Sequence, residues 1–311
     1  MRIANLNAYK LSPTARGSAG WQARITAIRE INPDILAVQE VVVDERALPR
    51  ERWNSAAAEV IHDLAEQCGL TATARASSGR PHVAMAANGH RPWYTALMWR
   101  PSTVSLLPDS FAPYGAPDFW HGLTTASFDV GGPEPLIVAS YHGDPFRPNF
   151  RADEALRIKG IFRRTGGVKP GFLVGDFNAP SAAVIDGEYY DDEWYRDQHH
   201  DDLEFQVQAG TIGGAQLADR RQAQALLRGG NMVDAAAHLE AAWRPTVGHW
   251  ADGRGDPDPW GPRRIDLILA TRPVAPALVS YATHRSAAAL DASDHLPVIA
   301  DFDPTAMRST R

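Results

Sequence analysis

Ten carboxylate, carboxamide and imidazole side chains stand at or near the ends of six apolar segments typical of β-strands. Packing does not explain this pattern, because strand ends meet the loops in which layered α/β proteins build their active sites. Taken singly, each residue also has a structural explanation, as a turn former, a cap, a hydrogen-bonded histidine or a salt-bridge partner. The set is more specific than its members, which are Asn7, Gln39, Glu40, His142, Asp144, Asp176, Asn178, Asp266, Asp294 and His295.

The chemistry that needs such a set is the hydrolysis of a phosphate ester. Glu40, Asp294 and the amide oxygen of Asn7 are hard oxygen ligands that suit Mg²⁺ or Mn²⁺, whereas no His/Cys cluster supports zinc. A divalent ion neutralises phosphate oxygens and stabilises the charge of an in-line displacement. An Asp and an Asn on one tight turn can deprotonate and hold water, and imidazoles supply protons near neutral pH.

Six short motifs, NLN, QE, SYHGD, GDFNA, RIDLIL and SDHLPV, follow one another in this order. The motifs resemble those of the endonuclease/exonuclease/phosphatase superfamily, also called deoxyribonuclease I-like. Their spacing extends from residue 3 to about residue 303, so the resemblance covers nearly the whole chain. The resemblance implies an α/β fold, a four-layer α/β/β/α sandwich of two mixed sheets with helices outside, and a cleft at one sheet edge.

The resemblance also implies roles for the residues that match its motifs. Glu40 would be the principal ligand of Mg²⁺ (or Mn²⁺), with Asn7 and Asp294 near the metal. Asp176 would activate or orient the attacking water, and Asn178 would help to position the phosphate.

Two histidines complete the catalytic set that the resemblance implies. His295 would contact the scissile phosphate, with Asp266 hydrogen-bonded behind it as an orienting partner. His142 would contact phosphate or assist the leaving group. The family's usual Asn-Thr-His is Ser140-Tyr141-His142 here, so we expect the hydrogen bond that supports this histidine to differ.

The basic or tyrosine side chain that many relatives place against the phosphate has no secure match. Tyr94 is one candidate, and residues 120–122 stand where a basic clamp is expected. Arg147, Arg151 and Arg157, before and within the helix that follows His142, supply phosphate contacts instead or form a solvated helix face.

The elements that must position these residues follow from apolar periodicity. The segments that we predict as strands are 3–9, 35–42, 95–100, 123–130, 136–142, 172–178, 265–271, 278–283 and 297–302. The segments that we predict as helices lie around 21–31, around 53–64, and at 152–164, 216–228 and 232–242.

Length and composition limit the possible architectures. The chain has 311 residues and a net charge of −6, which argues against a generally basic nucleic-acid coat. Its basic side chains are 28 arginines and only three lysines. We predict a single domain over 1–304 and a tail over 305–311. One cysteine, Cys68, cannot form an intrachain disulfide, and the N-terminus lacks the features of a secretory signal. We therefore expect a cytoplasmic location and no membrane association.

One acidic and aromatic segment departs from the strand and helix rhythm. Residues 186–204 hold nine acidic side chains and one arginine, within an insertion that we place at about 181–215. The segment is either a solvated acidic loop or a lid whose aromatic side chains, Trp194 among them, close over a compact substrate and repel long polyanions. The adjacent His199 and His200 are a weak candidate for an accessory cation site.

The substrate stays open at this point, because the superfamily acts on many phosphate esters. The absence of a basic stripe in the sequence favours a small-molecule or nucleotide-like phosphate ester. The alternative is a metal-dependent endonuclease or exonuclease on DNA or RNA, for which the arginines would have to cluster in space. A non-hydrolytic metal-assisted enzyme and a binding protein on this fold are less favoured, and the oligomeric state is not predicted.

Overall fold

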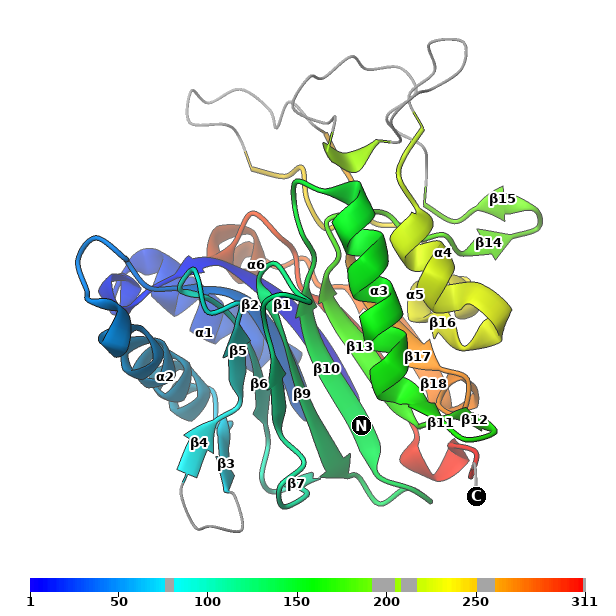
Figure 1. The fold of residues 1–311 in the computed structure, drawn as a ribbon, viewed down its shortest axis with the longest axis horizontal. Coiled ribbons are helices and arrows are strands. Elements are labelled where there is room, and N and C mark those ends of the chain that lie inside the picture. Colours follow the sequence, from blue (N-terminus) through cyan, green and yellow to red (C-terminus); the bar gives the residue numbers. More distant parts are fainter. Residues whose placement is uncertain (76–80, 192–204, 208–216, 251–260, 310–311) are drawn as a thin grey trace.

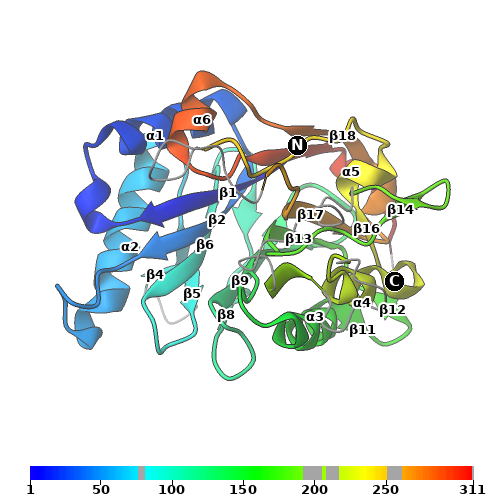
Figure 2. The same cartoon turned by 90° about the horizontal axis from the view of Figure 1, so that it is seen from above.

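Two mixed β-sheets lie face to face between helices, which gives the protein four layers (Figures 1 and 2). The computed structural model describes residues 1–75, 81–191, 205–207, 217–250 and 261–309. The helices, in chain order, are α1 (Ala19–Ile31), α2 (Arg50–Gln67), α3 (Pro148–Phe162), α4 (Arg221–Leu227), α5 (Ala235–His238) and α6 (Ala287–Ala292). The α/β/β/α sandwich predicted from the sequence is confirmed.

The first sheet contains the N-terminal strand at its centre. Only β1 and β2 run parallel, and every other neighbouring pair in this sheet is antiparallel. Its strands, in spatial order, are β18 (Leu278–Thr283), β19 (Val298–Phe302), β1 (Arg2–Leu11), β2 (Ile35–Val42), β6 (Trp93–Trp99) and β5 (Met85–Ala87).

The second sheet has one parallel pair, β10 and β13, at its centre. Its strands, in spatial order, are β16 (Met232–Asp234), β17 (Asp266–Thr271), β13 (Gly171–Asp176), β10 (Leu136–His142), β9 (Gly122–Asp129) and β7 (Ser105–Leu106), and β8 (Ala112–Tyr114) also pairs with β9. Three short pairs lie outside both sheets: β3 (Thr73–Arg75) with β4 (Pro81–Val83), β11 (Arg163–Arg164) with β12 (Gly167–Val168), and β14 (Val184–Ile185) with β15 (Glu188–Tyr189).

Apolar side chains fill all three interfaces between the layers. Between the sheets, one buried cluster includes Ile35, Leu97, Phe128, Phe172, Ile268 and Phe302. Outside the first sheet, α1 and α2 pack through Trp21, Ile25, Ile28, Val60 and Leu64. Outside the second sheet, α3 and α4 pack through Ala155, Ile158, Phe162 and Leu226. Because both faces of each sheet are covered, the central strands are apolar along most of their length.

Local sequence signals explain where the first helix begins and ends. The hydroxyl of Ser18 accepts a hydrogen bond from the Trp21 N–H at 3.1 Å, which caps the N-terminus of α1. Asn32 closes the helix in the left-handed conformation, with φ of 51°, and Pro33 follows it. The predicted helix is confirmed, and its stop brings β2 back beside β1.

The sequence prediction was wrong at 232–242. Met232–Asp234 forms the edge strand β16, which pairs antiparallel with β17, and only Ala235–His238 is helical. The Asp234 side chain accepts a hydrogen bond from Ala236 N at 3.0 Å, so it caps α5 instead of continuing a longer helix. The helix predicted at 216–228 begins only at Arg221.

Among the residues that the structure describes, no helix has both the length and the apolar character needed to cross a membrane. Met307, within the segment that the sequence predicts as a tail, is buried and packs into the cluster between the sheets.

Candidate active site

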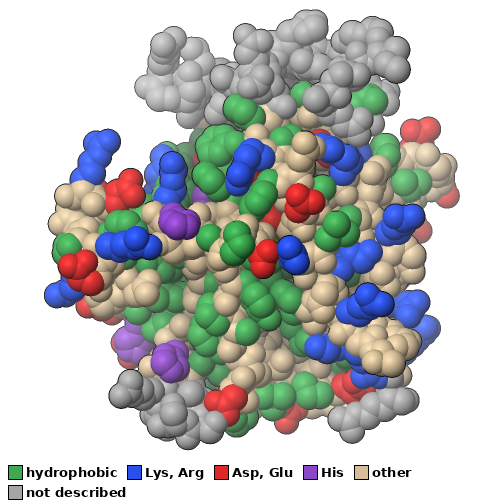
Figure 3. Space-filling view, in the orientation of Figure 1, with side chains coloured by type: hydrophobic (Ala, Val, Ile, Leu, Met, Phe, Trp, Pro, Cys, Tyr) green, Lys and Arg blue, Asp and Glu red, His purple; other side chains and the backbone are tan. Residues whose placement is uncertain are grey.

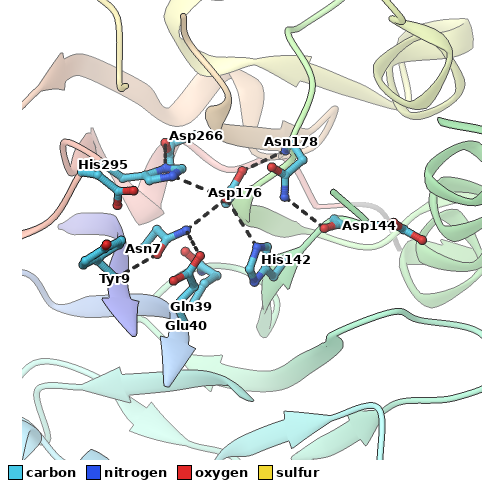
Figure 4. A network of polar contacts seen from close by, with 12 residues as sticks. Asn7, Tyr9, Gln39, Glu40, His142, Asp144, Asp176, Asn178, Asp266 and His295 are labelled. Atoms are coloured by element: carbon cyan, nitrogen blue, oxygen red, sulfur yellow. Dashed lines mark hydrogen bonds and ion pairs between the residues drawn. The ribbon is translucent and has the colours of Figure 1, made fainter. Parts of the chain in front are cut away.

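The ends of strands from both sheets bring the predicted residues together at one edge of the sandwich (Figure 4). In the second sheet, His142 at the end of β10 pairs in register with Asp176 at the end of β13, and Asp176 pairs with Asp266 of β17. From the first sheet, Asn7 of β1 donates a hydrogen bond to Asp176 Oδ2 at 3.0 Å. The site therefore spans the junction between the two sheets.

A glycine permits the close pairing on which this arrangement depends. A Cβ at Gly175 would collide with the backbone oxygen of Tyr141 on the neighbouring strand β10. Any larger residue would therefore separate β13 from β10 and move the next residue, Asp176, away from His142.

Asp176 is the hub of the network. Its Oδ1 accepts the Asn178 N–H at 2.8 Å, and its Oδ2 lies 3.5 Å from His142 Nε2 and 3.9 Å from His295 Nε2. Burial raises the pKa of Asp176 to about 7, against the opposing effect of the charge on His295. A carboxylate with such a pKa can take a proton from water near neutral pH.

Asp266 and His295 form a buried pair beside this hub. His295 Nδ1 lies 2.8 Å from Asp266 Oδ2, and Asp266 Oδ1 accepts a hydrogen bond from Asn5 at 3.0 Å. Burial opposes a charge on the ring, but the carboxylates of Asp266 and Asp176 raise the pKa of His295 well above its ordinary value. His295 is therefore an imidazolium that presents Nε2–H toward the centre of the site.

Two adjacent backbone irregularities aim Glu40 into the site. The register of β2 shifts between Val38 and Val41, and Glu40 itself has φ of 57°. Such bulges occur near active sites, where they redirect a side chain. Glu40 Oε2 accepts the Lys10 N–H at 3.0 Å, and Oε1 lies 3.4 Å from Asn7 Nδ2.

The oxygen atoms around Glu40 fit a hard divalent cation. Burial raises the pKa of Glu40, and the charge of Asp294 raises it further. No described residue forms an ion pair with either carboxylate. Arg24, whose charge acts on both, donates instead to the carbonyls of Ala8 and Tyr9. Two carboxylates without a paired cation are hard oxygen donors that suit Mg²⁺ or Mn²⁺. The Asn7 amide turns its Nδ2 toward Glu40, and its Oδ1 accepts the Tyr9 N–H at 3.1 Å.

A second set of groups is close enough to hold a cation, but its protonation opposes this. Ligand atoms of Asp176, Asp266 and His295 lie within 4.8 Å of one another. His295 Nδ1 is bonded to Asp266, and the raised pKa of this ring keeps both nitrogens protonated. A metal-binding imidazole must be deprotonated, so these three residues fit an acid–base unit better.

His142 has a neighbour that the sequence does not reveal. The ring of His121 stacks on the ring of His142, with centroids 4.0 Å apart and planes at 13°. Burial lowers the pKa of His142 well below its ordinary value, and burial together with Arg91 lowers the pKa of His121 to about 3. Both rings are therefore neutral, and they act through hydrogen bonds and shape and not through charge.

The family model of the endonuclease/exonuclease/phosphatase family matches residues 4–295. The chain belongs to this family. The resemblance noted in the sequence is thereby confirmed. The family comprises hydrolytic phosphoesterases and nucleases that generally depend on a divalent metal, so the general enzyme class is supported as well. A search of curated protein sequences finds no match.

Solved structures of the family share the fold at low sequence identity. A mannosyl-6-phosphatase from Bacteroides thetaiotaomicron is 15% identical, with a TM-score of 0.54 over 97% of this chain and 99% of that chain. D. rerio TDP2, complexed with a single-strand DNA product, is 13% identical, with a TM-score of 0.57 over 97% and 98%. An AP endonuclease from Archaeoglobus fulgidus is 20% identical, with a TM-score of 0.56 over 97% and 99%. These likenesses show the fold.

The structure of this family member brings the predicted catalytic residues together but separates the candidates for phosphate binding. Tyr94 points to the outer face of its sheet, where its hydroxyl donates to Asn54 of α2 at 2.7 Å. Arg151 is buried, and its guanidinium donates to the carbonyls of Asp144 and Phe205. These two side chains hold elements together, and neither presents its polar group to Asp176.

Of the remaining candidates for phosphate binding, two arginines lie on α3 or at its start, and the others lie outside the described residues. Arg157 is exposed on α3 and pairs with Asp118 at 3.1 Å, as expected for a solvated helix face. Arg147 lies at the start of α3, where its Nε donates to Asp144 at 2.6 Å. Trp194, His199, His200 and the rest of 192–204 lie outside the described residues.

The described part of the acidic segment is exposed at 186–189 and held at its end. Asp191 is buried, and both of its carboxylate oxygens accept hydrogen bonds from Arg264. The Tyr190 hydroxyl donates to the carbonyl of Ala241 at 2.8 Å, and Arg220 lies over the ring of Tyr189. Residues 190 and 191 are therefore bound beside the second sheet.

Sequence reasoning missed several residues that support the site. Asn5 could have been found, because in the motif NLN it lies two residues before Asn7 on the same face of the strand. Ser293 begins the motif SDHLPV, which assigns it no role: its hydroxyl donates to the Asn7 carbonyl at 2.7 Å and accepts the His295 N–H at 3.0 Å. Gln39 joins the sheets through Ser140 at 3.0 Å and does not face the metal ligands.

Proposed function

We propose that this protein is a Mg²⁺- or Mn²⁺-dependent phosphoesterase that hydrolyses a small phosphate ester. One observation carries the proposal: the hub Asp176 lies between Asn7, His142 and His295, with the oxygen ligands of Glu40 next to it. A carboxylate, neutral and charged imidazoles and a hard-oxygen donor set at one point are the components that phosphate ester hydrolysis needs.

Asp176 is the group that we assign to the water. Its position at the junction of the sheets is fixed by the hydrogen bonds from Asn7 and from the Asn178 N–H. With a pKa of about 7, Asp176 takes a proton from the attacking water and keeps that water oriented. Asn178 Nδ2 donates to the Gly143 carbonyl at 3.1 Å, which leaves its second hydrogen for a phosphate oxygen.

His295 is the group that we assign to the phosphate. Its Nδ1 is held by Asp266, so Nε2–H is directed at a fixed point and does not rotate. An imidazolium there stabilises the negative charge that develops on the phosphoryl oxygens. His142, neutral and stacked on His121, holds the opposite side through a hydrogen bond from its ring.

Glu40, Asn7 and Asp294 are the residues that would hold the metal. When bound, Mg²⁺ neutralises the phosphate oxygens and stabilises the charge of the transition state. The bulge at Glu40 and the Lys10 N–H fix the orientation of the principal carboxylate. Metal binding would also relieve the burial of an unpaired charge at this position.

Several of the described arginines are not available to the basic groove that a nuclease requires. Several are buried in the fold and donate to backbone carbonyls or to buried carboxylates, namely Arg24, Arg151, Arg220 and Arg264. On the face seen in Figure 3, Lys and Arg side chains lie singly or in small groups among acidic and apolar ones. Such a surface favours one compact substrate over a strand with many phosphates.

A nuclease is the second candidate, and a specific observation favours it. Two of the solved structures that share this fold are TDP2 with a single-strand DNA product and an AP endonuclease. A mannosyl-6-phosphatase shares the fold with a similar TM-score, so the fold does not decide between them. The experiment must therefore compare both substrate classes directly.

The test is a hydrolysis assay of the purified protein with Mg²⁺, with Mn²⁺ and with EDTA. The substrates are mannose 6-phosphate, nucleoside monophosphates and p-nitrophenyl phosphate, beside plasmid DNA, single-stranded DNA and RNA. We expect metal-dependent release of phosphate from a small ester and a loss of at least ~10²-fold in Glu40→Gln. Glu45→Gln, in the exposed loop after β2, is the matched control.

Three results would overturn the proposal. Metal-dependent nicking of plasmid that disappears in Glu40→Gln, with no small ester hydrolysed, would establish the nuclease. Hydrolysis at an equal rate in EDTA would remove the metal from the reaction, and an equal rate in Glu40→Gln would remove Glu40 as its principal ligand.

A further inference from the structure

A tryptophan borders the site on the side of His142. Trp120 directly precedes His121, the residue whose ring stacks on His142. Trp120 is half-buried, and the exposed ring of Phe146 meets it edge-on with centroids 6.4 Å apart. The stacked histidines therefore separate this rim from the hub Asp176, so a group bound at the rim is next to the reacting phosphate but distinct from it.

Two guanidinium groups lie over the ring of Trp120. The Arg147 guanidinium is 4.5 Å from the ring centroid, and that of Arg91 is 5.5 Å away. Arg147 also lies 4.2 Å from the ring centroid of Phe150. Both arginines are exposed, and an aromatic ring holds a guanidinium in place without using its N–H donors.

The donors of these arginines are mostly unused. Arg147 donates through Nε to Asp144 at 2.6 Å, which fixes the plane of the group. Within the described part of the chain, no acceptor takes a hydrogen bond from its two terminal nitrogens or from the side chain of Arg91. Two oriented guanidinium groups with free donors are suited to a phosphate or carboxylate, whose oxygens they bind in pairs.

A single buried carboxylate holds the two segments that form this rim. Glu154 of α3 accepts the Trp120 N–H through Oε1 at 2.8 Å and the Asp144 N–H through Oε2 at 3.2 Å. Asp144 then orients Arg147. The rim is thus tied to a helix of the scaffold, which is what a preorganised binding site requires.

We propose that Arg91, Trp120 and Arg147 form a subsite for a second anionic group of the substrate, next to the phosphate that is cleaved. The inference rests on the proposed phosphoesterase function and narrows its substrate to an ester with two phosphates, or a phosphate and a carboxylate. The second phosphate has two sources, a small bisphosphate or the neighbouring nucleotide of a strand.

The test compares the binding of two probes that differ only in the number of phosphates. Propyl phosphate and propane-1,3-diyl bisphosphate are titrated into the protein with Mg²⁺ in a calorimeter. We expect the bisphosphate to bind at least about tenfold more tightly, as charge-assisted hydrogen bonds at two guanidinium groups predict. Arg91→Gln and Arg147→Gln should each lose most of this preference while propyl phosphate binds as before.

The control is Arg272→Gln, an exposed residue directly after β17 and at the other end of that strand from Asp266, which should keep the full preference. Equal binding of the two probes, or a preference that survives in the Arg91→Gln/Arg147→Gln double variant, would overturn the subsite. Thermal unfolding of each variant confirms that it is folded.

Two further measurements separate the sources and the two proposals. A thymidine trinucleotide that binds more tightly than the bisphosphate, and loses this advantage in the same variants, would confirm the subsite and assign its ligand to nucleic acid. The titrations are repeated with the Asp176→Asn protein, in which hydrolysis of the probes is suppressed, so that binding is measured apart from turnover. A bisphosphate preference in a protein that hydrolyses no ester would leave the subsite intact and reject the proposed function.

Discussion

Two buried polar clusters in this protein differ in how their charges are balanced. In the first, which we call the Arg264 cluster, the Arg264 guanidinium lies 2.6 Å from Asp191 and 2.5 Å from Asp234. Trp243 Nε1 also donates to Asp191, and Asp234 caps α5. The two carboxylates raise the pKa of Arg264 well above its ordinary value despite its burial, so the cation is secure.

The second, which we call the catalytic cluster, comprises Asn7, Glu40, His142, Asp176, Asp266 and His295. Its residues are buried except for Glu40, which is half-buried, and its three carboxylates share one cation, His295, whereas Arg264 bonds to both carboxylates of the first cluster. Burial raises the pKa values of Glu40 and Asp176, as it does that of Asp191. Polar atoms around it also lack partners, since Asn5 Oδ1 and Gln39 Oε1 accept no hydrogen bond from the described residues.

The comparison shows that burial of polar groups does not by itself mark an active site. The Arg264 cluster joins the 181–191 segment to the edge of the second sheet, and its satisfied charges have no capacity for a substrate. The catalytic cluster keeps a deficit of positive charge and hydrogen bonds that a metal and a phosphate ester can supply. A carboxylate that pairs with no cation of the described residues, as at Glu40, distinguishes the functional cluster, and polarity alone does not.

The largest effect that we expect comes from removing the cation of the Arg264 cluster. Arg264→Met leaves Asp191 and Asp234 buried without their cation, so the free energy of unfolding should fall by about 3–5 kcal/mol. Urea unfolding monitored by fluorescence measures this loss. Turnover per folded molecule should change far less than stability.

Neutralising the carboxylates should reverse that loss. Adding Asp191→Asn and Asp234→Asn to the Arg264→Met protein removes both buried charges, and more than half of the stability should return. An Arg264→Met protein as stable as the wild type would show that the two clusters do not differ in the way described.

The second prediction makes the matching change in the catalytic cluster. Asp176→Asn keeps the shape of the hub and removes its charge, so turnover of a phosphate ester should fall at least ~10²-fold. The free energy of unfolding should stay the same or rise, because the substitution removes a buried negative charge that the cations of the cluster do not fully balance. The assay and urea unfolding are run on the same preparation, and a loss of stability as large as that of Arg264→Met would contradict the comparison.

The sequence predicts the catalytic cluster better than the Arg264 cluster, for a physical reason. Strand ends and short motifs mark where Glu40, Asp176 and His295 lie, because their positions follow from the order of the strands. Asp191 and Arg264 are 73 residues apart, and their pairing depends on the path of an irregular segment. The bond between Asp266 and His295 is the one that the resemblance implies, whereas no motif pairs Asp191 with Arg264.

The boundaries of secondary structure are likewise hard to predict from sequence where tertiary contacts determine them. Strands with long apolar runs, such as β2 and β10, are predicted to the residue, because burial on both faces determines them. The alanine-rich stretch 232–242 favours a helix by propensity, but the free edge of β17 pairs with Met232–Asp234. The rim arginines Arg91 and Arg147 come together only through tertiary contacts with Trp120.

The third prediction concerns Glu154, a buried carboxylate that shares one feature with the Arg264 cluster and one with the catalytic cluster. Glu154 has complete hydrogen bonds, from the Tyr141 hydroxyl and from the N–H groups of Trp120 and Asp144, but no ion pair with a described residue. Burial raises the pKa of Glu154 to about 7. The folded state holds the proton of the Glu154 carboxyl more tightly than the unfolded chain does. The stability that this proton contributes is therefore complete below the ordinary carboxyl pKa and is lost as pH rises through 7.

This loss of stability with rising pH can be measured. Between pH 5 and pH 8, the wild type should lose roughly 2–3 kcal/mol of stability relative to Glu154→Gln, in which no proton is released. Urea unfolding of both proteins at the two pH values measures the difference, and Glu59→Gln on the exposed side of α2 is the control in which it should be absent. A constant difference between wild type and Glu154→Gln would mean that hydrogen bonds alone keep the carboxylate ionised. Charge balance would then matter less in the buried clusters of this fold than complete hydrogen bonding.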